Sequence, residues 1–311
     1  MDNKDNNKSA WTEPFYKERN IGKCLSLGVS LISNRFFKIF RLASPVIAFA
    51  AVVFTFVTFT FCNAEYEYDF ADSALFRAFA AVIILIAVAA LAAFAYRCVD
   101  VNIEGLNIFS IGFKYTYNKE FWRKTIVAMI IGVLTLIVAL AFITLAQVTV
   151  NFFSVTPGQN GISILAVIIY GLAVGMATVL TIPLYMSLNR MMIDKKNLYN
   201  DFKQGYILGW KKWGRIFALD LLINLIMAVM AVFILSPAYV TSLMMHSATL
   251  SKLQGDAVDI PAYFNLITIC VIFFSSVIWS IFIIARYLPH AYFYANVVTE
   301  DKEFDNNVNK K

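Results

Sequence analysis

The sequence predicts an all-α membrane protein that crosses the bilayer six times, and three observations predict it. The chain has 311 residues, 60% of them hydrophobic, and a mean hydropathy of +0.68, which is too apolar for an ordinary soluble domain. Its apolar residues form six unbroken runs, each able to cross a hydrocarbon core, which takes about 20 residues of helix. The runs do not alternate apolar and polar residues as the strands of a membrane barrel would.

Each run is predicted to be a helix, because lipid offers no partners for unpaired backbone groups. The spans are Leu42–Cys62, Ala74–Tyr96, Thr125–Val150, Ile162–Leu188, Ile216–Val240 and Tyr263–Leu288. The first run begins only behind a long charged segment, unlike the apolar core of a cleavable signal peptide. We divide the chain into a polar N-terminal segment (1–20), one six-helix transmembrane domain (21–298) and a polar tail (299–311).

Several positions inside the spans predict details of packing. Pro45 in span one and Pro183 in span four are sites for helix kinks. Gly171 and Gly175 in span four form a Gly-x-x-x-Gly pattern, which is typical of close helix packing. Gln147 in span three is expected to hydrogen-bond a neighbouring helix.

The cations stand on one side of the spans. All of the 26 Lys and Arg residues except Arg77 and Lys252 lie before span one, in the loops after spans two and four, at the end of span six or in the tail. By the positive-inside rule, both termini are cytoplasmic. We expect a cell membrane, and residue usage favours a bacterial inner membrane. Nucleic acid is excluded as a partner because the net charge of +6 follows topology and is not gathered on one soluble domain.

Aromatic and basic residues precede three of the spans at helical spacing. The stripes are Leu25, Val29, Ile32, Phe36 and Ile39 before span one; Leu106, Phe109, Phe113, Tyr117 and Phe121 before span three; and Tyr199, Phe202, Tyr206, Trp210, Trp213 and Phe217 before span five. We predict three cytoplasmic amphipathic helices in the bilayer interface, with cations near anionic lipid headgroups. The residues assigned to this interface are Phe36, Phe37, Phe121, Trp122, Arg123, Trp210, Lys211, Lys212 and Trp213.

These three segments also resemble one another. Ser26-Leu27-Gly28 recurs as Ser110-Ile111-Gly112, and Lys119, Phe121 and Arg123 correspond to Lys211, Trp213 and Arg215. One interpretation is a unit of interfacial helix plus transmembrane hairpin, repeated three times. The other is that any helix preceding a span on the inner face converges on aromatic and basic residues.

The layout also carries a family resemblance. Two segments place a glycine–aromatic pair, then cations and another aromatic residue, before a long apolar span. They are Gly112-Phe113-Lys114 through Phe121-Trp122-Arg123 and Gly205-Tyr206 through Lys212-Trp213-Gly214-Arg215. This pattern resembles bacterial six-span inner-membrane proteins and is similar to the membrane domain fused to some glycerophosphodiester phosphodiesterases. The chain has no room for the soluble phosphodiesterase domain, so the resemblance implies a layout and not that activity.

Asp220 is the main candidate for a functional residue, because a carboxylate inside a span is costly unless it is paired or hydrated. Asn224 lies one turn deeper on the same face, and Arg286 reaches a comparable depth at the end of span six. We predict an ion pair between Asp220 and Arg286. It is interpreted either as a clamp between helices or as part of a polar site open to the cytoplasm.

Other chemistry receives no support from the residues. The two histidines, His246 and His290, are expected on opposite sides of the bilayer, which excludes a metal site built from both within one subunit. His290 is interpreted as an interfacial residue rather than a proton relay. The four cysteines predict no structural disulfide, and no motif for a nucleophile or a bound phosphate is present. We therefore expect no enzyme activity and no cofactor.

Two functional classes follow. The first is a scaffold, accessory or assembly subunit of an envelope complex, with the bilayer and a protein partner or a second copy of the chain as its contacts. The second is a transporter or permease subunit for a small solute or a lipid, using a site around Asp220 and Asn224. A continuous hydrated cavity reaching Asp220 would favour transport, and a dry packed core would favour the scaffold.

Overall fold

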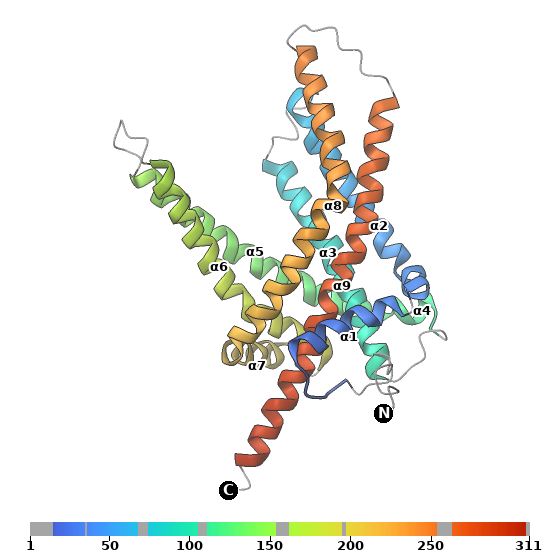
Figure 1. Ribbon diagram of the computed structural model, residues 1–311, viewed down its shortest axis with the longest axis vertical. Helices are drawn as coiled ribbons and strands as arrows, with labels where there is room; N and C mark the ends of the chain where they lie inside the picture. The colour runs from blue at the N-terminus through green and yellow to red at the C-terminus, as the bar shows by residue number, and fades with distance from the viewer. Residues whose placement is uncertain are drawn as a thin grey trace, which may run out of the picture. The chain divides into compact units, whose positions relative to one another are not determined.

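The computed structural model describes residues 15–34, 36–67, 74–104, 111–153, 162–194, 197–253 and 263–308. Nine helices lie within these residues (Figure 1). They are α1 (Ile21–Ser33), α2 (Phe36–Glu67), α3 (Ala74–Ile103), α4 (Phe113–Thr116), α5 (Lys119–Phe153), α6 (Ile162–Ile193), α7 (Leu198–Lys211), α8 (Trp213–Leu253) and α9 (Tyr263–Val308).

Six of these helices, α2, α3, α5, α6, α8 and α9, are long and apolar enough to cross a membrane. Each contains one of the spans expected from the sequence, so the prediction of an all-α, multi-pass membrane protein is confirmed. The helices extend beyond those spans. For example, α3 continues past Tyr96 to Ile103, and α9 continues past Leu288 to Val308.

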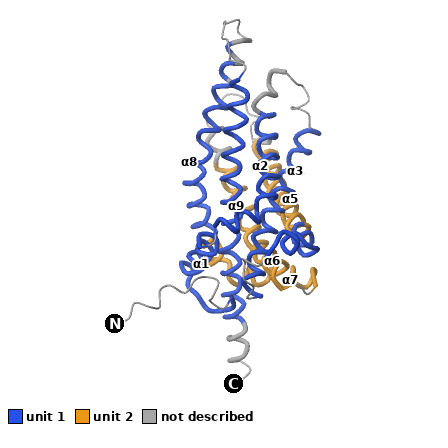
Figure 2. The backbone as a smooth tube through the Cα atoms, turned by 90° about the vertical axis from the view of Figure 1, so that its right-hand side faces the viewer, with its two compact units in different colours: residues 1–125, 220–311 blue, residues 126–219 orange. Residues whose placement is uncertain are grey.

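The chain divides into two compact units (Figure 2). Unit 1 consists of Met1–Thr125 and Asp220–Lys311, and unit 2 of Ile126–Leu219. In unit 1, α9 contacts α1, α2 and α3. Its bulky residues Tyr292, Phe293 and Tyr294 are almost completely buried, as are Phe94 and Tyr96 of α3, and together these aromatic side chains supply much of the core.

Two short helices pack against long ones through glycine. A Cβ added to Gly28 of α1 would lie 2.7 Å from ring atoms of Pro289 in α9, too close for any side chain. A Cβ on Gly209 of α7 would lie 2.7 Å from the Cα of Pro183 in α6, and one on Gly205 would lie 2.6 Å from the Cα of Ser187. Small residues let helix backbones approach in this way. The absence of a Cβ at these glycines therefore fixes where α1 and α7 sit.

The Gly-x-x-x-Gly pair of span four does not have this role within the described chain. A Cβ at Gly171 or Gly175 would meet no atom within 4 Å. The close approach in unit 2 instead uses Gly205 and Gly209, which have the same spacing on α7. Gln147 of α5 does bond a neighbouring helix, because its side-chain oxygen accepts a hydrogen bond from the Tyr170 hydroxyl of α6.

Prolines lie inside helices without ending them. A proline has no N–H to give to the carbonyl four residues before it. For Pro183 that carbonyl belongs to Val179, and the indole Nε1–H of Trp213 donates to it at 3.2 Å. For Pro45 the freed carbonyl is that of Arg41, which accepts from the Ser44 hydroxyl at 2.8 Å. Ser236 donates in the same way to Phe233, four residues before Pro237. Neighbouring donors thus satisfy these carbonyls, as lipid cannot.

The order of elements is one short helix followed by two long ones, three times over. Helix α1 contacts α9, and α7 contacts α6. The segment containing α4 contacts α3, where the carbonyl of Tyr115 accepts from Arg97 at 3.0 Å. Each short helix thus packs on the second helix of a pair. This order agrees with a threefold repeat, which stays a prediction.

The short helices differ from the stripes expected before the spans. Helix α1 ends at Ser33, so Phe36 and Ile39 belong to α2, and α7 ends at Lys211, so Trp213 begins α8. Before span three the described helix is a single turn, and Leu106 and Phe109 lie outside the described residues.

The glycine contacts predict which alanine substitutions lower the stability of the protein and which do not. We expect Gly28→Ala and Gly209→Ala to destabilise the protein by about 1–3 kcal/mol, the usual cost of overpacking. Gly22→Ala and Gly175→Ala, where the added Cβ meets open space, are matched controls. These controls are expected to be neutral or stabilising by up to about 1 kcal/mol, because alanine favours a helix over glycine. Thermal unfolding in detergent measures the difference, and equal effects at all four positions would contradict the packing.

Candidate functional site

Asp220 is buried on α8, within a span, and several polar groups gather around its carboxylate. The Asn224 side-chain amide, one helical turn further along, donates to Oδ2 at 2.9 Å. The Arg286 guanidinium of α9 donates to Oδ1 through Nη2 at 3.4 Å. The structure thus brings together the three residues that the sequence grouped, and Asp220 and Arg286 form the expected ion pair.

His290 is a fourth member that sequence reasoning missed. Its Nε2 lies 3.6 Å from Oδ1 of Asp220, and its side chain is 3% exposed. We had interpreted it as an interfacial residue because it follows Pro289, where span six was expected to end. Helix α9 instead runs through Pro289. In a continuous helix, Arg286 and His290 share one face because they are four residues apart, and that spacing was the available signal.

A second buried cluster lies between α3 and the start of α5. Asp100 accepts from Nη1 of Arg97 at 2.7 Å and from Nζ of Lys124 at 2.9 Å. The side chains of Lys124, Asp100 and Arg97 are only 0%, 3% and 4% exposed. Buried charges of this kind must be paired, because desolvation of an isolated charge is very costly.

Backbone carbonyls and aromatic rings complete this second cluster. Lys124 also donates to the Tyr96 carbonyl at 3.3 Å. The Arg97 guanidinium lies 4.9 Å from the ring centroid of Tyr115, in cation–π range. The Tyr115 hydroxyl donates to Glu104, and burial together with this hydrogen bond raises the pKa of the phenol. Carbonyl oxygens and a ring face therefore help to balance two cations against one carboxylate.

This cluster was not expected from the sequence, because the apolar run of span two ends at Tyr96 and both Arg97 and Lys124 belong to the loop that follows it. The structure places both in helices, since α3 extends to Ile103 and α5 begins at Lys119. The three-residue spacing of Arg97 and Asp100 was a signal for an ion pair on one helix face.

The predicted interface residues have two different environments. Phe36, Phe37, Trp122, Trp210 and Lys211 are exposed, as a contact with lipid or a partner requires. Arg123, which pairs with Glu120 at 3.1 Å, and Lys212, between α7 and α8, are partly exposed.

Two of the predicted interface residues serve the fold instead. Phe121 is buried against Tyr117, with ring centroids 4.9 Å apart. Trp213 stacks on Phe217 and donates to the Val179 carbonyl. Their aromatic character was therefore no guide to exposure.

The chemistry that this arrangement supports is limited. Asp220, Arg286 and His290 can hold charge within a span, and of these Asp220 and His290 can also exchange a proton. Among the residues that the structure describes, no three His, Cys, Asp or Glu side chains are grouped as a metal site requires. No known protein family, curated protein or solved structure matches the chain. The resemblance in layout stays a prediction.

The cluster around Asp100 predicts how strongly three substitutions lower the stability of the protein. Asp100→Asn leaves two buried cations without their shared carboxylate, and we expect a loss of about 3–5 kcal/mol, typical of breaking a buried pair. Lys124→Met leaves the Arg97–Asp100 pair intact, so its cost is expected to be smaller. Glu120→Gln breaks a partly exposed pair and serves as the control, at about 0–1 kcal/mol. Unfolding in mixed micelles measures the three values, and a loss for Asp100→Asn no larger than the control would contradict the network.

Proposed function

We propose that the chain is a non-enzymatic inner-membrane protein that acts as a scaffold or accessory subunit of an envelope complex, with both termini in the cytoplasm. The observation that carries this proposal is that two buried carboxylates of unit 1, Asp220 and Asp100, are each held by side chains of the same unit. Asp220 is held by Arg286, His290 and Asn224, and Asp100 by Arg97 and Lys124.

The surroundings of Asp220 support the same conclusion. Arg286 borders a cavity of about 300 Å³ whose other walls are almost entirely apolar side chains. A pathway for a polar solute normally presents polar groups near the middle of the membrane. An apolar cavity beside a self-neutralised cluster fits a packed support better than such a pathway.

Surface residues suggest where a partner or lipid makes contact. On α7, Tyr199, Ile207 and Trp210 are exposed, while Leu208 and Gly209 are buried. Lys203 and Lys211 are exposed on the same helix. Helices with apolar and cationic exposed residues suit the boundary between acyl chains and anionic headgroups, and aromatic residues are common in protein interfaces. We propose α7 as part of the contact surface on the cytoplasmic side, where the positive-inside rule places it.

A transporter is the second candidate, and the proximity of His290 to Asp220 is the observation that favours it. Chains of carboxylates and histidines inside spans can carry protons in pumps and transporters. On this hypothesis the cluster would take up and release a proton while a solute or a lipid is transported.

Asp220→Asn separates the two candidates. If the cluster is a structural clamp, the substitution lowers stability by about 1–3 kcal/mol, the usual cost of leaving buried polar groups poorly paired. Proton flux into proteoliposomes, followed with a pH-sensitive dye under an imposed potential, is then the same as in empty vesicles for wild type and variant. The scaffold role also predicts a second polypeptide in fixed ratio when the chain is purified from native membranes at native expression level.

Leu225→Ala is the matched control, because Leu225 lies on the same helix with an exposed side chain. Unchanged stability of Asp220→Asn, combined with a wild-type proton flux that the variant abolishes, would overturn the scaffold in favour of transport.

A further inference from the structure

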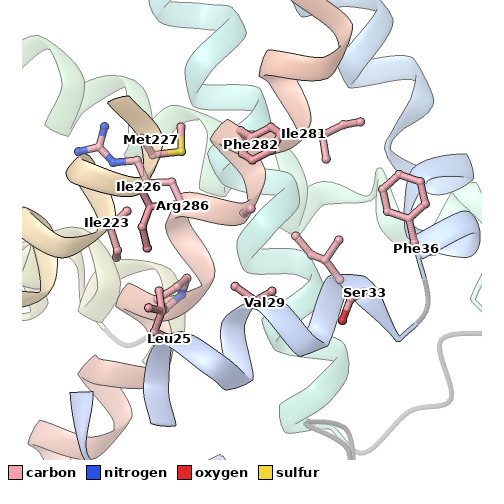
Figure 3. A pocket seen from close by; sticks show the side chains of 13 residues that line it. Leu25, Val29, Ser33, Phe36, Ile223, Ile226, Met227, Ile281, Phe282 and Arg286 are labelled. Atoms are coloured by element: carbon pink, nitrogen blue, oxygen red, sulfur yellow. The ribbon is translucent and has the colours of Figure 1, made fainter. Parts of the chain in front are cut away.

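An apolar groove lies in unit 1 between α1, α8 and α9, and we name it the α1 groove (Figure 3). Leu25 and Val29 come from α1, Ile223 and Met227 from α8, and Phe282 from α9. The groove has a volume of about 300 Å³. That volume reaches the lower end of the range for small-molecule sites, roughly 300–1,000 Å³.

The groove exists because α1 is held against α9 by one face only. Cys24, Leu27, Gly28 and Leu31 of α1 are buried, and Gly28 touches Pro289. The neighbouring face, with Leu25 and Val29, is directed into the groove, and the Val29 side chain remains 53% exposed. Helix α1 is thus anchored, while part of its apolar surface is not covered by the residues that the structure describes.

The lining decides what kind of occupant fits. Ordered water needs two or more polar partners, which an apolar lining does not offer. A hydrocarbon chain needs none, and the chain lies in a bilayer that supplies one. At about 300 Å³, the groove has room for part of a hydrocarbon chain.

The charge of the segments that contribute the groove lining indicates which headgroup an occupant would carry. From residue 21 to residue 45 the chain has no carboxylate, and the described cations there are Lys23, Lys38 and Arg41. Arg286 lines the groove itself, and 28% of its side chain is exposed although it pairs with Asp220. Cations next to a membrane surface attract anionic lipids.

We propose that the α1 groove binds one acyl chain of an anionic phospholipid from the adjacent leaflet, with the headgroup near Arg286 and the cations of α1 and α2. The proposal rests on the multi-pass membrane fold and is independent of the choice between scaffold and transporter. A firmly bound lipid would fill the space between α1 and the spans and hold the short helix in place.

Native mass spectrometry of the full chain tests the proposal. The protein is purified in detergent and titrated with dioleoyl phosphatidylglycerol or, in parallel, dioleoyl phosphatidylcholine. We expect one phosphatidylglycerol to bind at least 10-fold more tightly than the further lipids and than phosphatidylcholine. Ala285→Phe fills the groove from α9, and Val29→Phe fills it from α1 at an exposed position. Both are expected to lose this one lipid.

Controls make the result decisive. Val232→Phe adds the same ring to an exposed position of α8 outside the groove lining and should keep the lipid. Lys23→Gln with Lys38→Gln should remove the preference for phosphatidylglycerol but leave binding of a chain. Retention of the tight lipid in both groove variants would overturn the site, and equal affinity for the two lipids would overturn the anionic headgroup. A dimer whose formation the groove variants abolish would assign the groove to a second copy of the chain.

Discussion

The close approach of a glycine on a short helix to a proline in a long one is the contact on which the rest of unit 1 depends. Gly28 of α1 meets Pro289 of α9, and Gly209 of α7 meets Pro183 of α6 in unit 2. A side chain at either glycine would push the short helix away. With α1 in this position, its buried face completes the core around α9 and its other face forms a wall of the α1 groove.

Proline has a second consequence at these helices. Each proline removes a backbone donor, and the bilayer cannot replace it. The hydroxyl of Ser44 and the indole of Trp213 supply donors to the carbonyls that Pro45 and Pro183 leave open. Pro289 leads directly into His290 and lies three residues beyond Arg286, so the helix that holds α1 also carries two of the groups around Asp220. Packing of the short helix and neutralisation of the buried charge are therefore linked through one stretch of α9.

Run length and composition were enough to predict six helices, because hydrocarbon thickness sets how many apolar residues a span needs. They did not predict where the helices end. Arg97 and Lys124 were expected in a loop, yet they lie inside helices, where both cations pair with Asp100. His290 was assigned to an interface because a proline was taken as a helix end. Two partners of Asp220 were predictable. Asn224 is one turn away on the same helix, and Arg286 was expected at a similar depth in span six. The packing role of Gly205 and Gly209 was not predicted, because their segment was expected to lie in the bilayer interface.

A density map of the protein in nanodiscs containing phosphatidylglycerol would show whether the contact between Gly28 and Pro289 holds α1 in place and whether a lipid fills the α1 groove. We predict that α1 crosses α9 with Gly28 against Pro289, and that elongated density runs between Val29 and Phe282. A map in which α1 is detached from α9, or in which the groove is closed by collapse of α1 onto α8 without any such density, would contradict this prediction.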